Sequence, residues 1–253
     1  VKGNQMQLDK KLALVTGGVG RPGKAIAHKF IAEGAKVVII DIDDAEGKPC
    51  AQEIGATFIR HDVSLEDDWL RVSQQLEALG GLDILVNNAA ILRADNIESE
   101  TLDGFKRIMA VNCDSVFLGI KHCLPLMKHR NSSIINISSS SAMMGYPQFC
   151  AYTASKSAVR SLTMSTAVYS KQQGLGVRCN SIHPDGIVTP MVMNIAGTPP
   201  EFSDEQARHA ASFACLPEAI ADVVLFLASS ASRHMNGAAL SVDNTSTIHP
   251  PYH

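Results

Sequence analysis

Residues 11–41 read KLALVTGGVGRPGKAIAHKFIAEGAKVVIID, two apolar runs separated by a glycine-rich turn and a helical pattern. The runs Lys11 to Thr16 and Lys36 to Asp41 are short and apolar on both sides, which is typical of strands covered on both faces. Lys24 to Glu33 has the length and pattern of a crossover helix. We therefore expect a strand, a helix and a parallel second strand.

The same alternation of β-branched runs and helical stretches continues along the chain. Further strands are predicted at Thr57 to His61, Leu82 to Asn87, Ser132 to Ser138, Val177 to Ile182 and Ala239 to Val242. This alternation predicts an α/β fold, a doubly wound Rossmann-type parallel sheet with helices on both faces. No repeat, low-complexity tract or linker precedes residue 190, so we expect residues 1–253 to form a single domain.

Composition argues against several classes of function. The chain has 22 Lys and Arg against 25 Asp and Glu, a formal net charge of -3 that offers no bulk attraction to nucleic acid phosphates. Its six cysteines form no C-x-x-C pair and its nine histidines show no metal-ligand spacing, so we expect neither disulfides nor a metal site. No apolar run reaches the roughly 18 to 20 residues that span a bilayer, and no signal peptide is recognisable. We expect a cytoplasmic protein that binds neither nucleic acid nor membrane.

The glycine-rich turn, Thr16 to Gly23, has the features of a phosphate-binding loop. Backbone without Cβ atoms can approach a pyrophosphate closely, and the amino terminus of the following helix offers free N–H groups. Gly18 to Gly23 also reads G-x-G-x-x-G, a weak motif alone that gains weight from the strand before it and the helix after it. The alternative is a tight turn that binds nothing.

Asp41, at the carboxyl end of the second predicted strand, indicates which cofactor is bound. Its carboxylate would accept hydrogen bonds from the adenosine ribose hydroxyls and repel a 2′-phosphate, which favours NAD over NADP. Asp43 and Asp44 follow closely, so the alternative is an acid of a solvated loop.

Tyr152 and Lys156 lie four residues apart in a helical pattern, and hence on one helix face. A lysine ammonium beside a phenol lowers the tyrosine pKa, as proton transfer to or from a substrate oxygen requires. Ser139 follows a predicted strand at the sheet edge where ligands bind, and its hydroxyl can bind the same oxygen. Taken alone, such a tyrosine and lysine are an ordinary surface pair.

Taken together, the motifs resemble those of one family. They are T-G-x-x-x-x-x-G at Thr16 to Gly23, Asp62-Val63, Asn87-Asn88-Ala89-Ala90, Asn112, Ser139, Tyr152-x-x-x-Lys156 and Asn180-x-Ile-x-Pro184. From Lys11 to about Thr245 the chain resembles the short-chain dehydrogenase/reductase family. The stretches Arg60 to Ser64, Asn180 to Ile187 and Leu225 to Ser229 look most like bacterial hydroxysteroid dehydrogenases.

The resemblance implies a catalytic tetrad of Ser139, Tyr152, Lys156 and Asn112. Tyr152 would be the acid/base, Ser139 would orient the substrate oxygen, and Lys156 would also hold the nicotinamide ribose. Asn112 would hold a water in a proton relay, or alternatively would cap or brace its helix. The implied cofactor-binding residues are Gly17, Gly20, Arg21, Pro22, Gly23, Asp41, Asp62, Val63, Asn88, Ala89, Ala90, Tyr152, Lys156, Pro184, Gly186, Ile187 and Thr189.

Several positions depart from the family pattern. Arg21 stands where the family has its second glycine and Pro22 follows it, so a close-approach glycine and an N–H donor are missing. Arg21 would either replace the lost contact with its guanidinium or obstruct the cofactor. Asp185 replaces the glycine that usually follows Pro184, and Ala90 replaces the glycine that usually follows Asn-Asn-Ala.

An irregular stretch, about residues 190–216, interrupts the regular alternation. Its glycine and prolines precede a polar, Ala-rich segment, which predicts a substrate loop or lid, with Thr198 to Ala210 mobile before a ligand binds. Apolar side chains in and near it would either line a hydrophobic pocket or pack in the core: Met143, Met144, Phe149, Met191, Met193 and Ile195.

These inferences predict a single-domain, NAD-dependent oxidoreductase. It would interconvert a hydrophobic secondary alcohol, such as a hydroxysteroid or cyclic alcohol, and its ketone, with Tyr152 as acid/base. One alternative is a catalytically weak NAD(P)-sensing protein of the same fold, which Arg21 and Pro22 support best, and another is an interaction subunit. The resemblance implies a homotetramer built on the helices that contain Asn112 and Tyr152.

Overall fold

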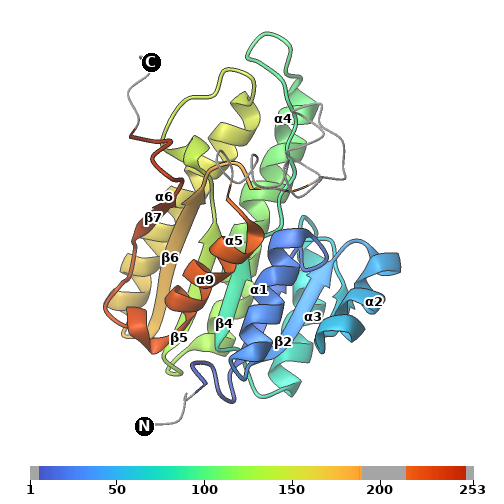
Figure 1. Ribbon diagram of the computed structural model, residues 1–253, viewed down its shortest axis with the longest axis vertical. Coiled ribbons are helices and arrows are strands. Elements are labelled where there is room, and N and C mark those ends of the chain that lie inside the picture. The colour runs from blue at the N-terminus through green and yellow to red at the C-terminus, as the bar shows by residue number, and fades with distance from the viewer. Residues whose placement is uncertain (1–5, 188, 190–214, 249–253) are drawn as a thin grey trace.

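A parallel sheet forms the centre of the computed structural model, which describes residues 6–187, 189 and 215–248 (Figure 1). Within these residues the sheet has seven strands in the order β3-β2-β1-β4-β5-β6-β7. The strands are β1 (Leu12–Thr16), β2 (Lys36–Asp41), β3 (Thr57–Arg60), β4 (Ile84–Asn87), β5 (Ser132–Ile137), β6 (Val177–Pro184) and β7 (Ala239–Val242). The predicted doubly wound α/β fold is confirmed. The strand order reverses between β1 and β4, the place where such sheets bind ligands.

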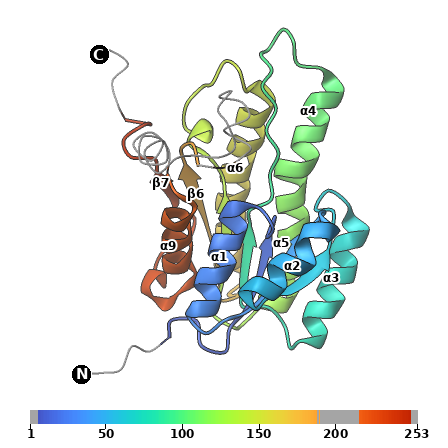
Figure 2. The same cartoon turned by 45° about the vertical axis from the view of Figure 1, so that its right-hand side comes forward.

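Helices connect the strands and cover both faces of the sheet (Figures 1 and 2). They are α1 (Arg21–Ala32), α2 (Asp44–Ile54), α3 (Glu66–Ala78), α4 (Leu102–Met109), α5 (Ser115–Met127), α6 (Cys150–Gln172) and α9 (Pro217–Ala228). Between α4 and α5 the chain forms a π-helical turn, η1 (Ala110–Asp114), and after β5 a short 3₁₀ turn, η2 (Ser140–Ala142). The site is therefore built on rigid elements that end at one edge of the sheet.

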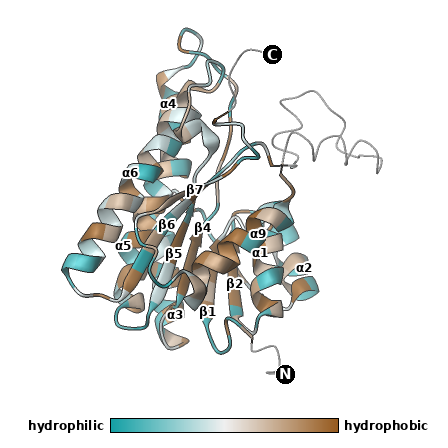
Figure 3. Ribbon diagram, turned by 60° about the vertical axis from the view of Figure 1, so that its left-hand side comes forward, coloured by the Kyte–Doolittle hydropathy of each residue, from teal (hydrophilic) through white to brown (hydrophobic). Residues whose placement is uncertain are grey.

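The sheet separates two hydrophobic cores because successive strand residues point to opposite faces. On one face Val15 and Ile39 pack with residues of α1, α2 and α9, and on the other Leu14 and Ile40 pack with residues of α3, α5 and α6. The central strands are buried on both sides and are largely hydrophobic along their length (Figure 3).

Predicted and observed strand ends agree within one or two residues. The difference that matters for the site is at β6, which continues to Pro184 and does not end at Ile182 as predicted. The extension pairs with β7 and brings His183 to the ligand edge of the sheet. No helix in the described part of the chain is long and apolar enough to cross a membrane.

Most of the predicted substrate loop lies outside the described residues. This applies to Thr198 to Ala210 and to three of the six apolar side chains, Met191, Met193 and Ile195. The two ends of the stretch are described: Ile187 and Cys215 form an isolated β-bridge, and the Cys215 N–H donates to the Gly186 carbonyl over 2.8 Å.

Candidate active site

A cavity of about 450 Å³ opens at the carboxyl ends of β1 to β6. Its volume is within the usual range for small-molecule sites, and its position is the ligand edge of a doubly wound sheet. Most of the predicted site residues line it: Gly17, Gly20, Arg21, Pro22, Asp41, Asp62, Val63, Asn88, Ala89, Ala90, Ser139, Tyr152, Lys156, Pro184, Ile187 and Thr189. The fold thus brings together residues from seven separate stretches of the chain.

The glycines of the turn after β1 serve different purposes. Gly17 has a left-handed backbone (φ +63°), and a Cβ there would lie 2.9 Å from the Ala89 Cα atom. At Gly23 a Cβ would lie 2.2 Å from the Gly17 carbonyl oxygen, so this glycine lets α1 pack against the turn and does not line the cavity. At Gly20 a Cβ would meet one atom only, 3.5 Å away. Gly20 therefore leaves cavity space that a ligand can fill.

The amino terminus of α1 has the properties of an anion site. The helix begins at Arg21 after the N-cap residue Gly20, which provides no side-chain cap, and its first turn contains no acid. The exposed guanidinium of Arg21 adds positive charge at the same end of the cavity. Pro22, in the second helical position, removes one N–H donor. The turn and the helix together have the chemistry to hold an anionic group such as the pyrophosphate of a dinucleotide.

Asp41 is held at the end of β2 by backbone amides. Its carboxylate accepts from the Val19 N–H over 3.1 Å and from the Asp43 N–H over 3.3 Å. The first bond joins Asp41 to the glycine-rich turn, so the acid and the predicted phosphate site are fixed relative to each other. Asp43 has a different role, because its side chain caps α2 through the Ala45 and Glu46 amides.

Asp62 lines the cavity just beyond β3, and Ser64, two residues later, fixes its position. It accepts from the Ser64 amide over 2.9 Å and from the Ser64 hydroxyl over 2.6 Å. Burial opposes its charge, but these bonds and the Arg107 guanidinium bring the Asp62 pKa below its ordinary value. Arg107 comes from α4 and also lines the cavity. The sequence contained no signal for it, because it sits in a helical pattern that motifs do not cover.

Asn88 connects the end of β4 to the glycine-rich turn. Its amide Nδ2 donates to the carbonyls of Thr16 (2.9 Å) and Gly17 (3.1 Å). The Thr16 hydroxyl in return accepts from the backbone amides of Asn88 and Ala89, each over 2.9 Å. These four bonds set the spacing of the two strands at the point where their order reverses.

Ser139, Tyr152 and Lys156 meet on the other side of the cavity. Ser139 follows β5, while Tyr152 and Lys156 lie in the first turns of α6. Ser139 and Tyr152 line the same part of the cavity and Ser139 acts to lower the Tyr152 pKa, while the Lys156 ammonium lies 5.6 Å from the centroid of the tyrosine ring. This is the geometry expected of groups that bind one substrate oxygen.

The structure contradicts the expectation that Lys156 lowers the pKa of Tyr152. Burial raises the pKa of Tyr152 to about 12, and Ser139 only partly opposes this. Lys156 is not among the groups that shift this pKa, and its Nζ donates to the Ile137 carbonyl over 2.9 Å. Burial also lowers the pKa of Lys156 to about 8, with the Cys113 thiol acting in the opposite direction. Lys156 therefore loses its proton at a lower pH than an ordinary lysine.

Asn112 and Gly186 do not line the cavity. Asn112 is buried in the turn η1, where its side-chain Nδ2 donates to the Ile91 carbonyl (2.9 Å) and its Oδ1 accepts from the Ile91 amide (2.8 Å). A third bond joins its Nδ2 to the Ser155 hydroxyl over 3.2 Å. These contacts are those of a brace, the alternative that the sequence left open. The relay role stays a prediction.

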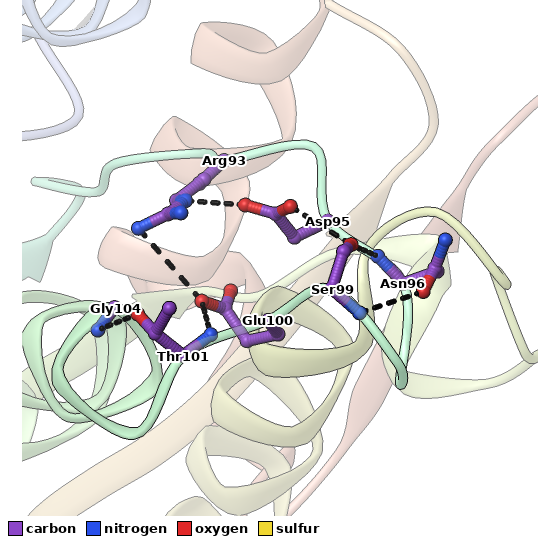
Figure 4. Close-up of polar contacts among 7 residues, drawn as sticks. All are labelled: Arg93, Asp95, Asn96, Ser99, Glu100, Thr101 and Gly104. Atoms are coloured by element: carbon purple, nitrogen blue, oxygen red, sulfur yellow. Dashed lines mark hydrogen bonds and ion pairs between the residues drawn. The ribbon is translucent and has the colours of Figure 1, made fainter.

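The loop between β4 and α4 forms a rim of the cavity through Ile91 and Leu92. A cluster of side chains orders this loop (Figure 4): Arg93 pairs with Asp95 and lies 3.8 Å from the Glu100 carboxylate. The Asp95 carbonyl in turn accepts from the Cys150 N–H over 3.3 Å, at the start of α6. The rim is therefore tied to the helix that contains Tyr152.

Some cavity residues were not predicted. They are Ile42, His61, Ile91, Leu92, Arg107, Val111, Ile137, Ser138 and Asp185. Most directly follow or precede a predicted site residue, and that adjacency was the only available signal. Conversely, Met143, Met144 and Phe149 do not line this cavity.

His61 is the most unusual of these additions. It is 1% exposed and packs edge-on against Trp69, with ring centroids 4.6 Å apart. Burial lowers its pKa to about 4, so the ring is neutral, and its Nε2 has no hydrogen-bond partner. Among the described residues, neither His61 nor any other side chain belongs to a group of three that could bind a metal ion.

Comparison with known proteins places the chain in a family. A family model described as enoyl-(acyl carrier protein) reductase matches residues 22–246. The chain is 42% identical over 247 residues to the 3-beta-hydroxysteroid dehydrogenase of Comamonas testosteroni, covering 94% of this chain and 96% of that protein. It is 36% identical over 244 residues to the NADP-dependent (R)-specific alcohol dehydrogenase of Lentilactobacillus kefiri, with coverage of 94% and 96%.

A solved structure gives the same result. The ligand-free aldohexose dehydrogenase of Thermoplasma acidophilum superposes with a TM-score of 0.87 at 30% identity, covering 99% of both chains. The sequence and structural matches extend over nearly the whole chain and include the strands, the turn and the helix that build the cavity. The chain therefore belongs to the short-chain dehydrogenase/reductase family, and bacterial hydroxysteroid dehydrogenases are among its relatives.

Proposed function

We propose that this protein is an NAD-dependent oxidoreductase that interconverts a hydrophobic secondary alcohol, such as a hydroxysteroid or cyclic alcohol, and its ketone. The observation that carries the proposal is one cavity that joins Ser139, Tyr152 and Lys156 to the glycine-rich turn and Asp41. NAD, when bound, supplies the acceptor for the hydride.

The choice of NAD rests on Asp41. A carboxylate fixed at the end of β2 accepts from ribose hydroxyls and repels a 2′-phosphate. The relative from Lentilactobacillus kefiri is NADP-dependent, so the family does not decide between the two. In this chain Arg21 lies at the amino terminus of α1, and the proposal assigns it to the pyrophosphate and not to a 2′-phosphate.

Tyr152 and Ser139 handle the proton and the substrate oxygen. The Ser139 hydroxyl orients the oxygen, and the Tyr152 hydroxyl gives a proton to a ketone or takes one from an alcohol. Because burial raises its pKa to about 12, Tyr152 is protonated at neutral pH, the form that reduction of a ketone needs. Oxidation of the alcohol needs the phenolate, so we expect its rate to rise with pH.

The substrate class rests on apolar lining and on a relative. Ile91, Leu92 and Ile187 line the cavity, and the relative with 42% identity is named for 3-beta-hydroxysteroids. Apolar walls favour a steroid or cycloalkanol over a sugar, because they leave several sugar hydroxyls without hydrogen-bond partners.

The test is a survey of turnover by the absorbance of reduced nicotinamide, with NAD and NADP separately. Its substrates are 3- and 17-hydroxysteroids, cycloalkanols, aliphatic alcohols and an aldohexose. We expect steroids or cycloalkanols with NAD to give the highest kcat/KM, and Tyr152→Phe to lower kcat by more than about 100-fold while NAD affinity changes little. Unchanged turnover by Tyr152→Phe, or a preference for the aldohexose, contradicts the proposal.

A second candidate is a cofactor-sensing protein with weak turnover, favoured by Arg21 and Pro22 in the glycine-rich turn. It predicts tight NAD binding by fluorescence and no turnover with any substrate of the survey. A homotetramer in the cytoplasm remains a prediction of the resemblance, and light scattering coupled to size exclusion measures the assembly.

A further inference from the structure

His183, on the extension of β6, is fully buried and uses both ring nitrogens. Nδ1 lies 3.0 Å from the Ser139 carbonyl oxygen, and Nε2 lies 2.9 Å from the Ser181 hydroxyl. A carbonyl oxygen can only accept, so Nδ1 carries the hydrogen and donates it. In the neutral ring Nε2 then accepts from the Ser181 hydroxyl, which fixes the tautomer.

The contact takes over where backbone pairing ends. β5 and β6 pair up to Ile137 and Ile182, and one more bond runs from the Ser138 N–H to the Ile182 carbonyl over 2.9 Å. At Ser139 the backbone leaves the sheet, and the next bond from β6 comes from the His183 side chain. The Ser139 carbonyl also accepts from the Ala142 N–H over 3.0 Å, within the turn that follows. The His183 side chain thus connects the sheet to Ser139, the residue at which the irregular segment after β5 begins.

The groups around His183 keep it neutral. Burial lowers the pKa of His183 most, the bond to the Ser139 carbonyl opposes this, and the cationic Arg160 and Lys156 on α6 act in the same direction as burial. Asp185, the acid two positions along the same strand end, is engaged elsewhere, because it accepts from the hydroxyls of Ser140 and Ser246. A neutral ring can serve as a fixed donor without changing charge as substrate turns over.

We propose that His183 is a positioning residue: its Nδ1–H holds the Ser139 carbonyl and so keeps the Ser139 side chain in place beside Tyr152 in the cavity. The proposal rests on the proposed function, in which these two hydroxyls bind the reacting oxygen. Ser139 acts to lower the Tyr152 pKa. A displaced Ser139 therefore weakens catalysis and moves the pH at which alcohol oxidation reaches half its maximal rate.

Substitutions of His183 distinguish the effect of its hydrogen-bond donor from the effect of its size. Asn places an amide N–H near the Nδ1 position, Gln places it near Nε2, and Leu has similar size without a donor. We expect His183→Leu and His183→Gln to lower kcat about tenfold, the value of one hydrogen bond, and to move the half-maximal pH of oxidation upward by about half a unit or more. His183→Asn should match wild type in both. Ser170→Ala, which removes an equally buried hydroxyl bond at the other end of β6, should leave both unchanged.

Circular dichroism, melting temperature and NAD affinity show whether each variant is folded. If His183→Leu does not fold, the comparison of Asn with Gln decides, since both are polar and close in size. Equal losses in Asn and Gln, or an unmoved half-maximal pH in a variant with lowered kcat, assign His183 a packing role and overturn the proposal. Full activity in Tyr152→Phe overturns the proposed function instead, so the two failures are distinguishable.

Discussion

The half of the cavity formed by β1, β2 and the glycine-rich turn differs in construction from the half formed by β5, β6 and α6. The first presents backbone groups, the α1 amino terminus and acids already paired with amides, such as Asp41 with Val19. The second presents the partly buried Tyr152 and the buried Lys156, whose pKa values burial moves to about 12 and about 8.

The difference separates recognition from chemistry. Backbone donors are supplied by every residue except proline, so the first half accommodates Arg21 and Pro22 with the loss of a single N–H donor. Proton transfer depends on one group with one pKa, and the second half retains all three side chains of the motif. Substitutions in the first half should change affinity and cofactor choice, whereas those in the second should change rate.

The largest effect is expected for Lys156→Met. Loss of the ammonium should lower kcat at least about 100-fold. The same change should raise the free energy of unfolding near neutral pH, because the folded state disfavours the charged lysine, with a pKa of about 8 against the ordinary 10.5. The gain is as much as about 3 kcal/mol, reduced by loss of the bond to the Ile137 carbonyl.

The sign of this stability effect can be checked by pH. Between about pH 8 and 10.5 the unfolded chain binds more protons than the folded one, so wild type gains stability as pH rises through this window. The advantage of Lys156→Met should be constant below about pH 8 and disappear near pH 10.5 in urea unfolding. A variant less stable than wild type at every pH would show that the Ile137 bond outweighs the burial of charge.

His61, which follows β3, adds a buried titratable side chain beside the first half, with a pKa of about 4. A lowered histidine pKa means that the unfolded chain takes up a proton first, so wild type loses stability as pH falls from 6.5 towards about 4. At pH 4.5 the free energy of unfolding of His61→Phe, measured in urea, should have fallen from its neutral-pH value by about 2 to 3 kcal/mol less than that of wild type. His28→Asn, at an exposed helix position, is the matched control and should keep the wild-type slope. Equal slopes for wild type and His61→Phe would contradict the prediction.

Asp41→Ala tests cofactor choice in the first half. We expect the ratio of kcat/KM for NAD to that for NADP to fall about 10- to 100-fold, since a carboxylate facing a phosphate is repulsive. Asp44→Ala removes a nearby acid that pairs with Lys48 and should not change the ratio. Higher kcat/KM with NADP in wild type would mean that Arg21 sets the preference.

Arg21→Ala is expected to have the smallest effect. If the guanidinium replaces the missing donor, NAD binding should weaken about tenfold, as for a hydrogen bond to a charged group. Added salt should weaken wild type more than the variant. Tighter binding by Arg21→Ala in fluorescence titration would show that the side chain crowds the pyrophosphate.

The sheet and the catalytic side chains were predictable because they depend on local patterns. β-branched runs locate strands, and the Tyr152 to Lys156 spacing is a property of one helix. Their pKa values were not predictable, because burial and the Ile137 carbonyl come from the assembled fold. Arg107 and Leu92 also escaped prediction, since they reach the cavity from segments without a motif.

Asn112 shows a different limit of sequence reasoning. The motif located the residue, but motifs describe which residues are present and not which atoms they bond. The structure pairs both atoms of its amide with the Ile91 backbone in a π-helical turn. The role of such a residue depends on one extra residue per helical turn, which no periodicity of 3.6 can indicate.

The bridge between Ile187 and Cys215 has a consequence for evolution and engineering. The chain departs from the ligand edge and returns to it at the same point, so the two ends of the intervening stretch stay together whatever its length. Closing a loop twice as long costs only about 0.6 kcal/mol more. A change in the number of residues between Ile187 and Cys215 therefore costs little free energy, and it leaves the sheet and the groups around Tyr152 in place.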